Sequence, residues 1–165
     1  MVPAASPLNI IDFALLNFDF TFVQPNDNKA IELRDNFPKY ELDIDFGINT
    51  TEIIQVIIKA EINRGKKRVA GYSILAEVAC LFEFNKQISV SDDARNSIEG
   101  FSTIYIALNT LRGVISNMTT NAPLGKYLLP SIDLNDLISQ KKSQLVENEN
   151  FQHSDSSKAE KRKKS

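Results

Sequence analysis

The sequence has few of the residues on which most protein chemistry depends. It contains no tryptophan, one cysteine (Cys80) and one histidine (His153) among its 165 residues. A single cysteine excludes a disulfide framework within the chain, and a single histidine excludes a His/Cys zinc site or a histidine-dependent catalytic triad. Most metal-dependent and acid–base mechanisms are therefore excluded, and we expect neither a metal nor a cofactor.

Long apolar runs and an N-terminal basic region are also missing. No basic residue precedes Lys29, and the sequence has no uninterrupted apolar stretch of the length that a membrane-spanning helix requires, which is about 18 residues or more. A signal peptide would need a basic region followed by an apolar core. We therefore expect a cytoplasmic protein without direct membrane insertion.

Catalytic motifs are missing as well, because the chain has neither a glycine-rich phosphate loop nor a nucleophile elbow. Asp43 and Asp45 alternate along one strand face, which is typical of solvated residues. Cys80 follows the inward pattern of Val78 and Phe82, which is typical of a packing thiol. We expect that the protein is not an enzyme. A carboxylate enzyme is the remaining catalytic alternative, and it would need acids that converge in a closed cavity.

Charge is distributed unevenly along the chain. Residues 1–140 hold 12 basic and 17 acidic side chains, whereas residues 141–165 hold 7 and 4. An acidic folded part argues against nucleic-acid binding, which requires clustered Lys and Arg on the folded surface. The pattern favours a partner with a basic surface and no nucleic acid.

Four segments show the period of two that is typical of half-buried strands. They are residues 17–23, 40–48, 54–63 and 69–84, and an RGKK turn joins the last two into a long hairpin. The preceding run LNIIDFALL has no clean period, so it predicts either an extension of the first strand after a change of face or a short helix. Short and moderate loops between the strands predict an antiparallel sheet.

The period then changes to that of a helix between residue 101 and about residue 119. The reverse side of this helix is small and weakly polar, with Ile106, Thr110, Gly113 and Val114. One interpretation is that this mixture of small residues has no structural role, and the other is that the helix is buried in an oligomer interface.

An apolar segment, APLGKYLLPSIDLNDL at residues 122–137, follows the helix. Gly125 and Pro130 prevent a continuous helix, and Asp133 is a suitable N-cap for a short one. From about residue 141 the composition predicts disorder. We therefore predict one domain over residues 1–140 and a disordered charged tail over residues 141–165.

The order of these elements resembles the SecB family of protein-export chaperones. The similarity rests on FDFTFVQPN at 18–26, YELDIDFGINTTE at 40–52, LAEVACLFEF at 75–84 and LRGVISNMTTNAPLGKYLLPSIDLNDLI at 111–138. It covers roughly residues 8–138. The chain departs from the family pattern at residues 79–84, where glycines are common in the family, and at Val23, where an acidic residue is common.

The resemblance implies an α+β fold, in which a four-stranded antiparallel sheet has one long helix and a short C-terminal helix on one side. It implies a homotetramer, built as a dimer of dimers, in which the long helices are sandwiched between sheets. It also implies an apolar groove that binds unfolded polypeptides, although each side chain in it could serve ordinary core packing instead. The groove residues implied are Leu33, Phe37, Tyr40, Leu42, Phe82, Phe84, Leu128, Leu129 and Ile132.

The functions implied are those of an ATP-independent holdase that keeps precursors competent for export. Family members dock the motor protein SecA on an acidic sheet surface, of which Asp19 and Glu83 remain here. A second branch of SecB-like proteins serves antitoxins, which makes an antitoxin an alternative partner. An oligomeric binding or regulatory protein with one fixed partner is the other alternative.

Overall fold

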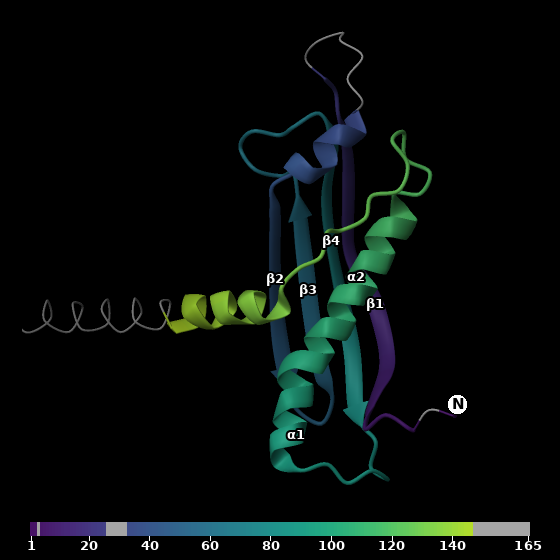
Figure 1. Cartoon of the computed structure of the whole chain (residues 1–165), viewed down its shortest axis with the longest axis vertical. Helices are drawn as coiled ribbons and strands as arrows, with labels where there is room; N and C mark the ends of the chain where they lie inside the picture. The colour runs from purple at the N-terminus through teal and green to yellow at the C-terminus, as the bar shows by residue number, and fades with distance from the viewer. Residues whose placement is uncertain (3, 26–32, 147–165) are drawn as a thin grey trace, which may run out of the picture. The chain divides into compact units, whose positions relative to one another are not determined.

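The computed structural model describes residues 1–2, 4–25 and 33–146, and it divides the chain into two compact units, Met1–Pro130 and Ser131–Ser165. The first unit contains a four-stranded antiparallel sheet in the order β1-β4-β3-β2 (Figure 1). The strands are β1 (Leu8–Val23), β2 (Leu42–Thr50), β3 (Ile54–Ile62) and β4 (Gly71–Phe84). The α+β class and the antiparallel sheet predicted from the sequence are both confirmed.

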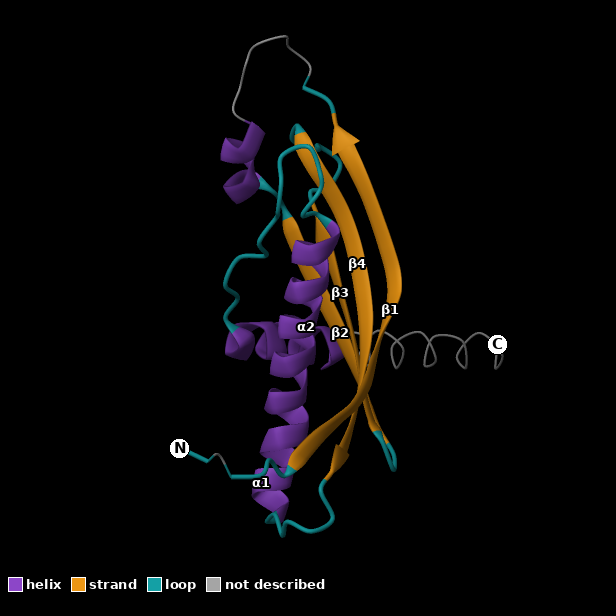
Figure 2. Cartoon of the chain, turned by 90° about the vertical axis from the view of Figure 1, so that its right-hand side faces the viewer, coloured by secondary structure: helices purple, strands orange, loops and turns teal. Residues whose placement is uncertain are grey.

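The core lies between this sheet and one helical segment. That segment begins with α1 (Asp92–Ser97), continues through a π-helical turn (Ile98–Ser102) and ends with α2 (Thr103–Met118). α2 packs on β3 and β4, and Figure 2 shows it on one face of the sheet. Burying each large apolar side chain here contributes about 1.5–3 kcal/mol. The fully buried side chains include Val56 and Ile58 from β3, Ile74, Val78 and Phe82 from β4, and Ile104, Leu108, Leu111 and Ile115 from α2.

The sequence predicted α2 but not α1. The segment DDARNS of α1 has no apolar period, so only its cap marks it as a helix. Ser91 is that N-cap, and its hydroxyl accepts a hydrogen bond from the backbone N–H of Ala94 at 3.4 Å. The 3-10 helix η1 (Leu33–Lys39) was not predicted either, for the same reason.

β1 is an edge strand, and it includes the run whose structure the sequence left open. Its register against β4 shifts between Ile10 and Asp12 and again between Leu15 and Asn17. Each shift inserts one extra residue, which is how a β-bulge changes the face that the following side chains occupy. The run therefore extends the first strand after a change of face, rather than forming a helix.

Asn63 fixes the hairpin that joins β3 to β4. Its φ angle is 55°, and its side chain is buried. The Nδ2 group donates to the carbonyls of Val69 (2.7 Å) and Tyr72 (2.6 Å), while Oδ1 accepts from the N–H of Val69 at 2.8 Å. Asparagine adopts left-handed backbone more readily than most residues, and its amide here replaces missing backbone pairing.

The second unit contains a helix over residues 134–146. Asp133 is its N-cap as predicted, since Oδ1 accepts from the N–H groups of Asn135 (2.9 Å) and Asp136 (3.2 Å). The helix continues past the predicted domain boundary at residue 140, because residues 141–146 contain neither glycine nor proline and favour helix. Residues 141–146 are therefore helical rather than disordered, and the rest of the predicted tail lies outside the described residues.

Among the described residues, no helix has the length and apolar character needed to cross a membrane.

Candidate functional site

The segment that leaves α2 is held against the sheet by side chains; we call residues 119–130 the strap. The Tyr72 hydroxyl accepts from the N–H of Leu124 at 2.7 Å and donates to the carbonyl of Gly125 at 2.8 Å. The buried Thr119 hydroxyl accepts from the N–H of Tyr127 at 2.9 Å. These side-chain bonds take the place of backbone pairing with a strand, so they fix the strap against the sheet although it is not a strand itself.

Two arginines also hold the strap, one at its middle and one at its last residue. Arg34 donates from Nε to the carbonyl of Leu124 at 2.6 Å, and Arg112 donates to the carbonyl of Pro130 at 2.9 Å. The Arg112 Nε atom is itself buried and has no hydrogen-bond partner in the described chain. Arginine suits this role because its fork of donors reaches backbone carbonyls from a distance.

Aromatic rings pack beneath the strap, and we call them the aromatic cluster. Tyr127 stacks on Tyr40 with ring centroids 5.9 Å apart, and Phe37 meets Tyr127 edge-on at 5.2 Å. Burial raises the pKa of Tyr127 to about 12 and also raises the pKa values of Tyr40 and Tyr72. All three tyrosines are therefore neutral across the physiological range. The cluster comprises Phe20, Phe22, Phe37, Tyr40, Tyr72 and Tyr127.

The strap presents one large apolar side chain to solvent. Tyr127 and Leu129 are buried, whereas Leu128 between them is 68% exposed. Neither the N–H nor the C=O of Leu128 is hydrogen-bonded to another residue in the described ranges. An exposed apolar side chain with free backbone groups is suited to an extended peptide, which pairs through its backbone and adds side-chain contacts.

The structure brings together only part of the predicted groove. Phe37 and Tyr40 lie in the aromatic cluster, where both rings contact the strap residue Tyr127. Leu128 and Leu129 follow Tyr127 in the strap, although Leu129 is buried and therefore a packing residue. Leu33 is half-buried at the start of η1, Leu42 is half-buried at the start of β2, and Ile132 is half-buried in the second unit.

Phe82 and Phe84 do not line the strap, so their assignment to the same groove is corrected. Phe82 is fully buried between β4 and the rest of the core. It lies ten residues beyond Tyr72 on β4, which corresponds to about 33 Å along a strand. The alternation of the sequence placed both phenylalanines on the inner face correctly, but it did not say at which end of the sheet they lie.

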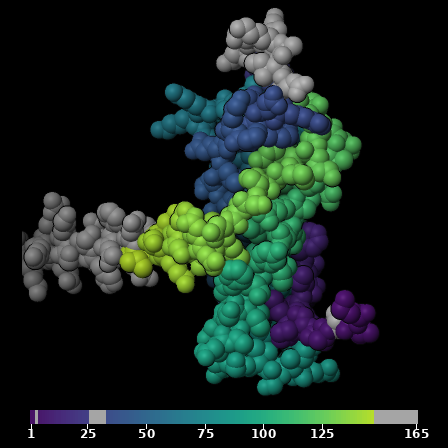
Figure 3. Space-filling model, viewed as in Figure 1, coloured from purple at the N-terminus to yellow at the C-terminus, as the bar shows by residue number. Residues whose placement is uncertain are grey.

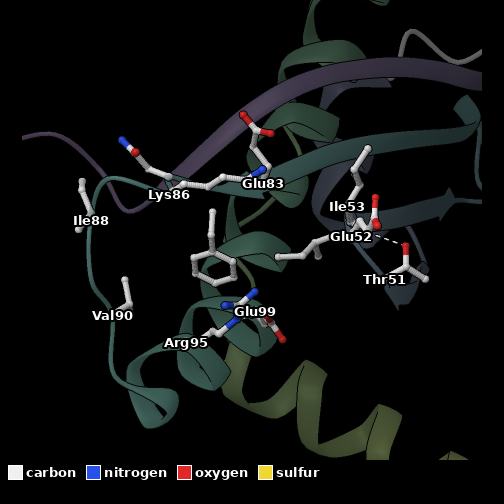
Figure 4. A pocket seen from close by; sticks show the side chains of 12 residues that line it. Thr51, Glu52, Ile53, Glu83, Lys86, Ile88, Val90, Arg95 and Glu99 are labelled. Atoms are coloured by element: carbon white, nitrogen blue, oxygen red, sulfur yellow. Dashed lines mark hydrogen bonds and ion pairs between the residues drawn. The ribbon is translucent and has the colours of Figure 1, made fainter.

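Phe84 lines a separate cavity of about 620 Å³ at the opposite end of the sheet (Figure 4). The β2–β3 turn, the end of β4 and α1 form its walls. The guanidinium of Arg95 lies 4.3 Å from the centroid of the Phe84 ring and pairs with Glu99 at 3.2 Å. Its lining is mixed, with Glu52, Glu83 and Lys86 beside Ile53 and Val90. No three His, Cys, Asp or Glu side chains of the described residues form a group that could hold a metal.

The face of the sheet opposite α2 is acidic. Asp19 and Glu83 both lie on it, since their strand partners are Leu75 and Asn9. Asp19 pairs with Arg64. The pairing register adds four acids to this face, and they lie around Lys59, whose pKa is raised chiefly by its hydrogen bond to Glu61. The added residues are Asp43, Asp45, Glu61 and Glu77.

A second apolar surface lies where α2 leaves β1 uncovered. Phe13 pairs with Cys80, whose thiol is buried, and this burial raises the pKa of Cys80. Phe13 is nevertheless 54% exposed. Of the residues predicted for the oligomer interface, Ile106, Thr110 and Val114 are half-buried and Gly113 is exposed. β1 adds exposed apolar residues that were not predicted for this interface, namely Ile10, Ile11, Phe13, Leu15 and Leu16.

This arrangement, a four-stranded antiparallel sheet with helices, is a SecB-like fold. A similar solved structure is that of Mycobacterium tuberculosis Rv1957, a SecB-like chaperone in complex with a ChAD peptide from the Rv1956 HigA1 antitoxin. The two chains are 13% identical, with a TM-score of 0.52, and the match covers 76% of this chain and 91% of that chain. At this identity the likeness establishes the fold alone.

Another match is a protein of unknown function from Streptococcus agalactiae, with 10% identity, a TM-score of 0.41 and coverage of 78% of this chain and 100% of that chain. It carries no functional argument. No protein-family model and no curated protein sequence matches the chain.

Proposed function

We propose that this protein is an ATP-independent chaperone that binds an extended, unfolded segment of a client polypeptide at the strap. The observation that supports it most is the exposed Leu128 with its unpaired backbone, fixed over the aromatic cluster in a SecB-like fold. In this proposed role the protein acts in the cytoplasm, is not an enzyme and needs no cofactor. We favour an antitoxin-type client over general export, because the similar chain Rv1957 is bound to an antitoxin peptide.

Selectivity for unfolded clients follows from the physics of the site. A folded protein has already buried its apolar segments, so it gains nothing at the strap. One contact such as Leu128 contributes about 1.5–3 kcal/mol, against an association cost of about 4–15 kcal/mol. A single strap therefore binds weakly, and several straps in one oligomer would bind a long client tightly. No ATP is required for this discrimination.

We propose that the oligomer forms through the uncovered surface of β1 and α2, and that its full form is a dimer of dimers. β1 offers unpaired backbone along its edge and five exposed large apolar side chains. An exposed apolar edge strand is normally paired or covered in a stable protein. A second copy of this chain would cover it.

We expect Phe13→Glu to reduce the mass of the oligomer. A carboxylate at this half-exposed position would be buried without a partner in the assembly, which is strongly unfavourable. Light scattering coupled to gel filtration measures the mass, and circular dichroism checks the fold. Thr21→Glu on the same strand is the control, since Thr21 pairs with Ser73 on the opposite face. A native protein that is already monomeric at micromolar concentration would contradict the proposal.

Breadth of binding tests the function itself. Fluorescence anisotropy would compare overlapping peptides from unrelated antitoxins with peptides from exported precursors. The antitoxin-type function predicts that a few antitoxin peptides bind in preference to all the others, and that Leu128→Ala weakens their binding several-fold. Suppression of aggregation of several unrelated unfolded proteins at stoichiometric ratio would instead support the general export chaperone. If neither peptides nor unfolded proteins bind, the chaperone function is wrong.

An export chaperone is the second candidate, and the acidic sheet face favours it. Asp43, Asp45, Glu61 and Glu77 enlarge the acidic surface beyond Asp19 and Glu83. Such a surface is complementary to a basic partner, and SecA is the partner that the export function would require. Calorimetry with SecA tests this candidate independently of client binding.

A further inference from the structure

Basic side chains gather at the end of the sheet where the strap lies. Three described loops meet there: residues 33–41, the hairpin at 63–70, and the strap at 119–130. Together they contain seven basic side chains and two acidic ones, Asp35 and Glu41. One of the seven, Arg64, pairs with Asp19. The other six have no carboxylate within ion-pair distance in the described chain, and they are Arg34, Lys39, Lys66, Lys67, Arg68 and Lys126.

Hydrogen bonds show that the three loops are one surface. Arg34 of η1 donates to the strap carbonyl of Leu124 at 2.6 Å, and Asn36 of η1 donates to the hairpin carbonyl of Ala70 at 3.1 Å. Figure 3 shows η1, the hairpin and the strap at the same end of the same face. The cations therefore lie at the end of the sheet to which the strap is anchored, and one of them, Lys126, is two residues before Leu128 in the strap.

This end contrasts with the rest of the described first unit. The opposite end, at the β2–β3 turn, the end of β4 and α1, has Glu52, Glu83, Asp92, Asp93 and Glu99 against Lys86 and Arg95. The whole chain has a formal charge of −2. The charge count along the sequence averages these two ends and therefore predicts a partner with a basic surface. The strap end itself has the opposite charge preference.

We infer that the polypeptide segment bound at the strap is apolar at its centre and acidic at its flanks. This inference rests on the proposed function and specifies the class of client. An apolar side chain of the client would contact Leu128, while its Asp or Glu side chains would face the six cations. Complementary charge of this kind raises association rates and rejects segments of the wrong sign. Basic apolar segments would be the disfavoured class.

The experiment uses the full chain and three labelled peptides that share one apolar centre and differ only in their flanks: Glu, Gln or Lys. We expect the Glu peptide to bind about tenfold more tightly than the Lys peptide at about 0.05 M salt, with a smaller ratio at about 0.3 M because salt screens exposed charges. Lys67→Glu should reduce this preference several-fold. Lys86→Glu, with the same change of charge at the opposite end, should leave it unchanged.

The outcomes separate the inference from the function. If all three peptides bind equally and Leu128→Ala weakens all of them, the inference is wrong and the proposed function stands. If none binds, both are wrong. If polyglutamate without an apolar centre, or a single-stranded oligonucleotide, binds as tightly as the Glu peptide, charge alone is recognised and the inference is also overturned.

Discussion

Asn63→Ala should lower the free energy of unfolding by about 3–4 kcal/mol. The substitution leaves two backbone carbonyls and one N–H in the hairpin without their partner, since Val69 and Tyr72 lose the Asn63 amide. Alanine also tolerates the φ angle of 55° less well than asparagine. Urea unfolding followed by circular dichroism measures the loss.

Asn63→Gly separates the two causes of this loss. Glycine removes the same hydrogen bonds but adopts the left-handed backbone without steric cost, so it should be about 1 kcal/mol less damaging than alanine. Equal losses for the two variants would show that the backbone conformation contributes nothing. A loss below about 1 kcal/mol for Asn63→Ala would show that water replaces the amide.

Tyr72→Phe should loosen the strap and weaken client binding about tenfold. The variant keeps the ring, which packs edge-on to Phe20 with centroids 5.0 Å apart. It removes the hydroxyl that binds the N–H of Leu124 and the carbonyl of Gly125. Two strap groups then lack a partner, which costs about 1–3 kcal/mol of stability. Hydrogen exchange at Leu124 and anisotropy with a bound peptide give the two readouts.

Tyr105→Phe is the matched control for this prediction. Tyr105 is an exposed tyrosine on α2, so the same loss of a hydroxyl should leave both readouts unchanged. If Tyr72→Phe accelerates exchange at Leu124 but peptide affinity stays the same, the strap is not the binding site. That result would leave the fold intact and refute the proposed site.

Much of the fold could be predicted from the sequence, because alternating burial leaves a direct pattern. The inward row of β4, from Tyr72 to Phe82, has the period of two throughout, and α2 has the period of a helix. The bulges at β1 could not be predicted, since inserting one residue breaks the period while the backbone stays extended. α1 and η1 were missed because short polar helices depend on caps and tertiary contacts.

Less of the candidate site could be predicted. The sequence singled out the strap by its proline and leucine content, and the resemblance to the SecB family implied that Phe37, Tyr40 and Leu128 line a groove. The resemblance also implied that Phe82 and Phe84 line it, and the strand period could not correct this, because it gives the face on which a residue lies and not its position along the sheet. The roles of Tyr72 and Tyr127 were missed, since the hydrogen bonds of Tyr72 to the strap and the stacking of Tyr127 on Tyr40 depend on how the chain after α2 returns to the sheet.

The two bulges of β1 also bear on how far self-association can proceed. A strand kinked after Ile10 and again after Leu15 is twisted along its length, so it matches a copy with the same kinks but not a flat edge. Flat apolar edge strands can pair with further copies without limit and form fibrils, whereas a kinked edge strand pairs with one matching copy and then has no further edge to offer. We therefore expect that deleting both Ile11 and Leu16, which removes both bulges and straightens β1, converts a finite assembly into an aggregating one.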